Sequence, residues 1–210
     1  MSQDMAAISR RVQRLESSII ICIGAGICVA AMVMSTAAGP NLAMWAMTMN
    51  ISGHSVYYAM SAFGTLSISD DFGYLIIWPG LVGNVLPCIT IIAGVMLSLA
   101  GIKKRKAGIV GGLIAIASPL VLVALLLSYN IAFTREVEPF DVIGIRELFL
   151  SLPDPNPLAG TASCPPYTLA WGIGISTYLP IAGGGVVLLG IVYNYLARER
   201  RGQQPIAPVS

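Results

Sequence analysis

The sequence has few charged residues. Lysine, arginine, aspartate and glutamate together make up 10% of the 210 residues, whereas apolar residues make up 56%. A soluble domain has about 25% charged and about 45–50% apolar residues. So low a share of charged residues excludes both a soluble globular domain and a disordered chain. It indicates an integral membrane protein whose first partner is the lipid bilayer.

Other scarce residues exclude classes of function. The chain has one histidine, His54, so we do not expect a histidine-ligated metal or haem site within it. Its four cysteines include no C-x-x-C pair, which argues against dithiol redox chemistry. The net charge of +2 is too balanced for a nucleic-acid partner. With no catalytic constellation visible, we expect a protein without cofactor or metal that is not an enzyme.

Four long stretches without charge predict four membrane-spanning helices, since a span needs about 20 mostly apolar residues. We predict helices at residues 18–38, 74–101, 108–129 and 169–196, outer loops at 39–73 and 130–168, and a cytoplasmic tail at 197–210. The predicted fold is an all-α integral membrane protein with a four-transmembrane-helix bundle, forming a single domain over residues 1–210. The first apolar run is longer than that of a signal peptide, so we interpret it as a retained anchor.

The basic residues predict the orientation in the membrane. Ten of the 12 lie in three clusters, Arg10–Arg14, Lys103–Lys106 and Arg198–Arg201. The positive-inside rule places all three clusters in the cytoplasm. We therefore predict a multi-pass protein of the cell membrane with both termini cytoplasmic and the acidic loops outside.

The two outer loops have different patterns. In the first, residues 42–51 and 56–68 read as strands around a turn that contains Gly53 and His54, which predicts a small β-hairpin. In the second, residues 141–152 have apolar side chains at helical spacing and predict a short amphipathic helix. The proline-rich residues 153–166 that follow predict an extended linker that is neither helix nor strand.

Small residues recur at helical spacing within the predicted spans. They let helix backbones approach closely, either inside the bundle or against another subunit. The candidates for helix packing or assembly are Gly26 and Ala30 in the first span, Gly108 and Gly112 in the third, and Gly174 and Gly184 in the fourth. Pro87, Pro119 and Pro180 also fall inside predicted spans, where each can kink its helix.

Three features of the outer side carry further predictions. Asn50-Ile51-Ser52 fits the N-glycosylation pattern. Cys164 is the only cysteine predicted outside, so it is either free or part of an intermolecular disulfide. Trp45, Trp78 and Trp171 lie near the predicted outer ends of spans and suggest an aromatic belt.

The layout of the chain resembles that of claudin-like four-helix membrane proteins. Two predicted helices joined by a long outer loop come first, a short basic turn follows, and then two more helices joined by a long outer loop. Both termini are predicted inside. Trp45 in a strand-like run and the glycine-rich residues 172–190 are similar to features of that family, whereas its paired cysteines in the first loop are absent. The resemblance implies a small sheet in the first loop and a scaffold or adhesion role.

Our leading hypothesis is a non-enzymatic membrane protein that acts as a scaffold, adhesion or assembly component through its outer loops and glycine-rich helix faces. It would form homo-oligomers or assemble with other membrane subunits. One alternative is an accessory structural subunit of a larger membrane complex, for example a respiratory one. Another is a channel that forms between protomers.

Overall fold

The computed structural model describes residues 3–36, 41–51, 53–63, 66–70, 73–77, 86–128, 158–164 and 167–202. These residues are mostly helical and include a sheet. In chain order the elements are α1 (Gln3–Met34), β1 (Trp45–Ile51), β2 (His54–Met60), β3 (Leu66–Asp70), β4 (Gly73–Ile77), α2 (Leu86–Ala100), α3 (Arg105–Ser128), β5 (Ala159–Cys164), β6 (Tyr167–Ile173) and α5 (Ile175–Gly202).

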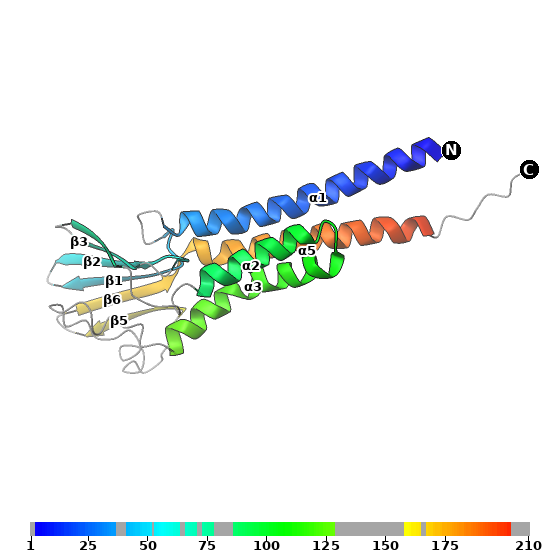
Figure 1. Cartoon of the computed structure of the whole chain (residues 1–210). Coiled ribbons are helices and arrows are strands. Elements are labelled where there is room, and N and C mark those ends of the chain that lie inside the picture. Colours follow the sequence, from blue (N-terminus) through cyan, green and yellow to red (C-terminus); the bar gives the residue numbers. More distant parts are fainter. Residues whose placement is uncertain are drawn as a thin grey trace, which may run out of the picture.

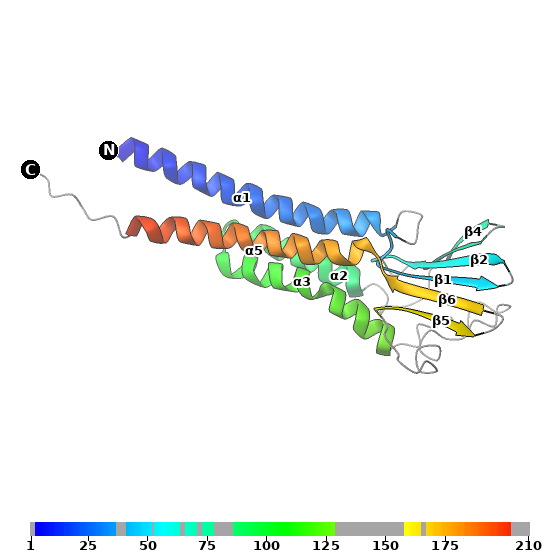
Figure 2. The same cartoon turned by 180° about the vertical axis from the view of Figure 1, so that it is seen from behind.

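The helices and the sheet occupy opposite ends of the molecule. Figure 1 shows α1, α2, α3 and α5 packed in a bundle, with the strands beyond one end of it. The reverse view in Figure 2 shows that α1 begins and α5 ends at the other end of the bundle, far from the sheet. The turn at 101–104 between α2 and α3 also lies away from the sheet (Figure 1).

The sheet joins two segments that are far apart in the sequence. Its strand order is β4-β3-β2-β1-β6-β5, and every neighbouring pair is antiparallel. Strands β1 to β4 follow one another as a meander, whereas β5 and β6 come from residues 159–173. The pairing of β1 with β6 therefore unites the segment after α1 with the segment before α5.

The hairpin that the sequence predicts in the first loop is present as β1 and β2. Gly53 in its turn has φ = 92°, a conformation that glycine adopts without steric cost. The second predicted strand, 56–68, is two strands in the structure, because β2 ends at Met60 and β3 begins at Leu66. The sheet thus extends well beyond the predicted hairpin.

Two predicted helix boundaries are wrong, and so is the all-α class. Residues 73–77 form β4 and α2 begins at Leu86, although the sequence predicted a helix from residue 74. Residues 167–173 form β6 and α5 begins at Ile175, although the prediction started the helix at 169. In both places a short apolar strand precedes an apolar helix within one charge-free part of the sequence, and hydropathy alone does not separate the two.

The remaining helices begin or end outside their predicted ranges. α1 begins at Gln3, because the basic segment before the apolar run continues the helix. α3 at Arg105–Ser128 agrees closely with the predicted 108–129. Pro119 and Pro180 lie within α3 and α5, whereas Pro87 is the second residue of α2, where a missing N–H leaves no hydrogen bond unmade.

The second loop also differs from its prediction. Residues 159–164 form the edge strand β5, which the prediction of a linker over 153–166 missed. The prolines of this segment flank the strand rather than interrupt it, so each backbone N–H of β5 is retained. The predicted amphipathic helix at 141–152 lies outside the described residues.

Three helices are long and apolar enough to cross a membrane. These stretches are Ala7–Met34, Arg105–Ala124 and Ile175–Leu196. The apolar helix Leu86–Ala100 has 15 residues and is shorter than a full span. The described chain therefore has the character of a membrane protein with a folded sheet at one end.

Candidate functional site

The sheet has one apolar and one small, polar face, because successive side chains of a strand point to opposite sides. Along β1, Trp45, Met47 and Met49 alternate with Ala46, Thr48 and Asn50. The strand register extends the apolar face to Val56, Tyr58 and Met60 of β2 and to Leu169, Trp171 and Ile173 of β6.

The apolar face forms one continuous core with the helix bundle. Trp45 is 0% exposed and belongs to the same cluster of buried residues as Met32 of α1, Ile91 of α2 and Leu122 of α3. Trp171 is also buried. The prediction of Trp45 and Trp171 as part of a membrane-interface belt is therefore wrong, because both side chains are buried in the core that the sheet shares with the helices.

Hydrogen bonds attach the start of α5 to the segment before β1. The backbone N–H of Gly174 and the hydroxyl of Thr177 both donate to the carbonyl oxygen of Met44, the former at 3.0 Å. The hydroxyl of Ser176 donates to the carbonyl oxygen of Leu42. Ser176 and Thr177 are buried, so these bonds replace water at polar groups that would otherwise be unsatisfied.

Gly174 is required at this junction for steric reasons. A Cβ atom at this position would lie 2.1 Å from the carbonyl oxygen of Ala43. Gly174 was predicted inside the fourth helix. In the structure Ala170 is in β6 and Gly174 lies between β6 and α5, so it packs a strand-to-helix connection against the chain before β1.

The end of α1 is attached to the sheet in a similar way. The buried hydroxyl of Ser35 donates to the carbonyl oxygen of Met32 at 2.7 Å and accepts the N–H of Ala62, two residues after β2, at 2.9 Å. The sheet is thus fixed to the bundle through both α1 and α5. These hydrogen bonds and the shared core join the sheet and the helices into one folded unit.

The second face of the sheet carries small or uncharged side chains. Its described residues in the three central strands are Ala46, Thr48, Asn50, Ser55, Tyr57, Ala59, Thr168, Ala170 and Gly172. Ala46 and Ala59 are buried with Ala43, whereas Asn50, Tyr57, Thr168 and Ala170 are exposed. An open, shallow hollow of about 370 Å³ lies on this face, beside the start of α5. Hydroxyl and methyl groups offer weak hydrogen bonds and apolar contact to a partner surface.

The predicted glycosylation site, the histidine and the outer cysteine lie near the ends of the strands that are farthest from the bundle. Asn50 is exposed beside the hairpin turn, and its side-chain oxygen accepts a hydrogen bond from the hydroxyl of Ser55. His54 is exposed at the start of β2. Cys164 is the last residue of β5, opposite Tyr167 in the register, and its side chain lies outside the described part. In the described ranges, no three histidine, cysteine or acidic side chains could hold a metal ion together.

Glycine pairs form the helix contacts of the bundle. A Cβ on Gly184 of α5 would lie 2.6 Å from the carbonyl oxygen of Gly112 of α3, and one on Gly108 would lie 2.7 Å from Ile191. Gly108, Gly112 and Gly184 therefore lie where two backbones approach closely. Sequence reasoning missed the matching pair of Gly94 in α2 and Gly111 in α3, where a Cβ on Gly94 would lie 3.1 Å from the Gly111 oxygen.

Gly26 and Ala30 lie elsewhere. Both are exposed on α1, and a Cβ on Gly26 would meet no atom within 4 Å. Instead Gly24, which was not among the predicted packing residues, contacts α5. The spacing of small residues predicted that α1 has a close helix contact but not which side of α1 makes it.

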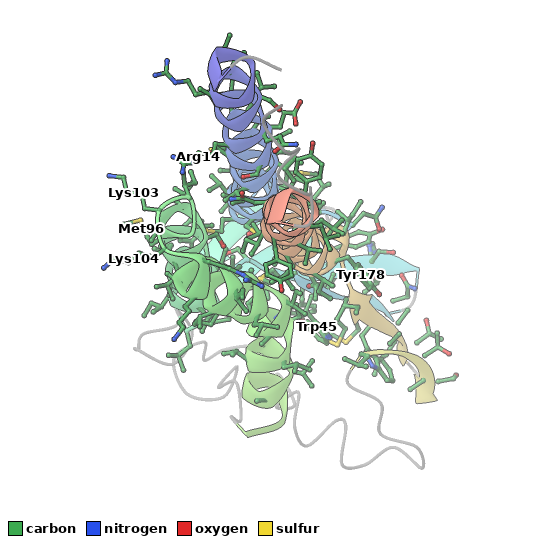
Figure 3. The ribbon with its side chains drawn as sticks, turned by 90° about the vertical axis from the view of Figure 1, so that its right-hand side faces the viewer. Arg14, Trp45, Met96, Lys103, Lys104 and Tyr178 are labelled. Carbon is green, nitrogen blue, oxygen red and sulfur yellow. The ribbon has the colours of Figure 1, made fainter. Side chains whose placement is uncertain are left out.

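The end of the bundle opposite the sheet is basic. Figure 3, viewed from that end, shows Lys103 and Lys104 pointing outward on the same side as Met96, with Tyr178 on the other side. Arg105 stacks over the ring of Tyr195 at 4.2 Å, and Tyr193 donates a hydrogen bond of 2.6 Å to Glu16. These contacts bring α1, α3 and α5 together at this end.

Comparisons with known proteins add no family to these observations. No model of a protein family matches the chain, and no curated protein matches it in sequence. Its function must therefore be inferred from the residues and their arrangement.

Proposed function

We propose that the protein is a non-enzymatic, four-pass membrane scaffold that assembles with copies of itself and presents the sheet outside the cell as an interaction platform. The observation that carries this proposal is the pairing of β1 with β6, which joins strands from the two predicted outer loops into one sheet beyond the end of the bundle. A rigid external surface suits a protein that holds partners in place.

The distribution of charge supports this orientation. The exposed basic side chains Arg14, Lys103 and Lys104 lie at the end opposite the sheet, as the positive-inside rule requires if that end is cytoplasmic. The apolar helix α2 lies within residues 78–102, the charge-free part of the sequence between β4 and the basic turn, and these 25 residues are enough for a fourth span. Both termini are then cytoplasmic.

The layout agrees with the expectation from the claudin-like resemblance. That resemblance implies a small sheet in the first outer loop, and β1 to β4 come from the corresponding part of this chain. The scaffold or adhesion role enters by this analogy. The uncharged face with Thr48, Ala170 and Gly172 is the part of the sheet that we assign to partner contact.

The test is purification in mild detergent from the native membrane, with mass spectrometry and a visible absorption spectrum. Recovery of this chain alone, at a multiple of 22.1 kDa, supports the scaffold. Recovery with a haem- or metal-bearing chain overturns it and makes the protein an accessory subunit of that complex. Ion flux through liposomes that contain only this chain overturns it in favour of a channel between protomers.

A matched pair of variants tests the platform. Ala170→Arg places a large charge on the exposed uncharged face, and Lys104→Glu changes charge at the opposite end. We expect Ala170→Arg to prevent clustering of proteoliposomes that carry the protein with the sheet outward, and Lys104→Glu to leave clustering unchanged. Equal clustering of wild type and Ala170→Arg would show that this face does not bind a partner.

A further inference from the structure

The exposed side of α1 carries a seven-residue repeat along its whole described length. Apolar or small residues recur at alternating spacings of four and three, and all of them are exposed: Ile8, Val12, Leu15, Ile19, Cys22, Gly26, Val29 and Val33. We call this set the α1 seam. Ile23 and Ala30 beside the seam are also exposed. Spacings that alternate between four and three residues over four heptads are the pattern of a helix that pairs in a left-handed coiled coil.

The α1 seam points away from the rest of the molecule. Ser17, Gly24 and Ala31, which are also spaced by seven residues, lie on the opposite side of the helix and are buried. Gly24 contacts Gly183 and Val187 of α5. The bundle therefore covers one side of α1 and leaves the seam open to a second molecule.

Lipid can cover only part of the seam. The contact between Glu16 and Tyr193 and the nearby pair of Arg105 and Tyr195 mark the basic end of the bundle. At 1.5 Å per residue, Ile8 lies about 12 Å beyond Glu16 along α1. Ile8 is 60% exposed and Leu15 is 62% exposed. A protein partner that covers these apolar side chains would remove them from water, which favours helix pairing in this zone.

The charges beside the seam fit a parallel copy of the same helix. Copies of a membrane protein share one orientation, so a two-fold axis between them runs along the bilayer normal and makes identical helices parallel and in register. In a parallel pair, a residue flanking the seam meets the residue five positions later in the other helix. Arg11 and Glu16, both exposed, have this spacing and opposite charges.

The residue types agree with a dimer. β-Branched residues at one seam position and leucine at the other favour two parallel strands, and here Val12 and Ile19 occupy the first position and Leu15 the second. Gly26 adds no side chain and allows close approach within the membrane.

We infer that α1 is the dimer interface of this protein. Two copies pair through parallel, in-register α1 seams, with Cys22 facing Cys22 of the second copy and Arg11 facing Glu16 of the second copy. This inference rests on the proposed self-assembly and names the surface that performs it. The sheet remains free for other contacts.

Disulfide cross-linking in native membranes tests the interface. The parent variant keeps Cys22 as its only cysteine and carries Cys28→Ala, Cys88→Ala and Cys164→Ser. We expect copper phenanthroline to convert it to a covalent dimer on a non-reducing gel. Because changes at the buried Cys28 and Cys88 could impair folding, a second form retains both and carries only Cys22→Ser and Cys164→Ser, with new cysteines placed at exposed sites.

A neighbouring pair of positions supplies the matched control. In the second form, Leu15→Cys lies on the seam and Arg14→Cys lies about 100° around the helix, and both sites are exposed. We expect the dimer yield at position 15 to exceed that at position 14 by about tenfold, since only seam residues approach their own copies. Equal yields at the two positions, or no dimer from either Leu15→Cys or Cys22, would overturn the interface.

Charge reversal provides an independent readout. Arg11→Glu places a carboxylate opposite Glu16 of the second copy, and symmetry makes this repulsion occur twice in the dimer. We expect it to lower the Leu15→Cys dimer yield about fivefold. Adding Glu16→Arg should restore the yield, and failure to do so would contradict the parallel register. A protein that purifies as an oligomer without seam cross-links refutes this interface and leaves self-assembly standing, whereas a monomer refutes the proposed self-assembly itself.

Discussion

Gly24 of α1 and Gly183 of α5 each occupy the space that a side chain on the other would need. A Cβ atom added to either glycine would lie 2.6 Å from the carbonyl oxygen of the other, closer than real Cβ atoms approach. The two backbones therefore touch with no side chain between them. Such close contact stabilises helix pairs in membranes, where the hydrophobic effect between helices is absent.

We expect Gly183→Ala to destabilise the bundle by about 2 kcal/mol, because the backbone of α1 must move to admit the methyl group. The obstructing atoms are the Gly24 oxygen and the sulfur of Cys28, each 2.6 Å from the added Cβ. Chemical unfolding in mild detergent, followed by the fluorescence of the buried tryptophans, measures the change.

The control is the neighbouring Gly185→Ala. A Cβ at this position meets no atom within 4 Å. Alanine also has the higher helix propensity, so we expect stability to be unchanged or to rise by up to about 1 kcal/mol. If Gly183→Ala and Gly185→Ala unfold alike, the contact of α1 with α5 is not as close as described.

The three consecutive glycines of α5 show what a sequence pattern can and cannot predict. Successive residues of a helix point about 100° apart, so Gly183 faces α1, Gly184 faces α3 and Gly185 faces neither. The sequence predicted close helix contacts from these small residues. It could not assign Gly183 to α1, because that assignment depends on how the helices are arranged around α5.

A second prediction concerns the junction of β6 with α5. We expect Gly174→Ala to destabilise the fold by about 3 kcal/mol, since its Cβ would lie 2.1 Å from the carbonyl oxygen of Ala43 and backbone on both sides would have to separate. The same unfolding experiment measures the loss, and quenching of Trp45 and Trp171 fluorescence by acrylamide reports whether the sheet has detached.

Gly172→Ala serves as the comparison two residues earlier in the chain. Its Cβ would lie 3.8 Å from the nearest atoms, which is ordinary van der Waals contact. We expect stability within about 0.5 kcal/mol of wild type. A larger loss for Gly172→Ala than for Gly174→Ala would contradict the described packing.

The sheet was harder to predict than the basic end of the bundle. Hydropathy identified the membrane character and predicted a helix at 108–129, close to the observed α3, and the glycine-containing turn identified the β1–β2 hairpin. Residues 167–173 are apolar enough to extend the following helix, and their pairing with β1 on one side and β5 on the other makes them a central strand. Such long-range pairing leaves no local signal, because the tertiary context overrides propensity.

Thr177 tests the hydrogen bonds that attach the sheet. Its buried hydroxyl donates to the carbonyl oxygen of Met44. We expect Thr177→Val, which keeps the shape but loses the donor, to cost about 1–2 kcal/mol. Thr177→Ser retains the hydroxyl and should recover most of the stability in the same unfolding measurement. Equal losses for the two variants would show that the methyl group, not the hydrogen bond, matters here.

The proposed orientation makes a prediction about chemical labelling of intact cells. Thr168→Cys lies on the exposed face of the sheet and Lys104→Cys lies in the basic turn at the opposite end. Each is introduced into a variant in which the natural cysteines are replaced at positions 22, 28, 88 and 164. A membrane-impermeant maleimide should label Thr168→Cys in intact cells and Lys104→Cys only after permeabilisation.

The labelling result separates the orientation from the fold, because both sites are exposed in either orientation and only the side of the membrane differs. Labelling of Lys104→Cys alone in intact cells would show that the orientation is the reverse of the proposed one, with the sheet in the cytoplasm. Labelling of both sites in intact cells would mean that the two ends do not lie on opposite sides of one membrane. Asn50 adds an independent reporter, since it is exposed beside the hairpin turn and would be glycosylated in microsomes only if the sheet enters the lumen, with Asn50→Gln as the unglycosylated control.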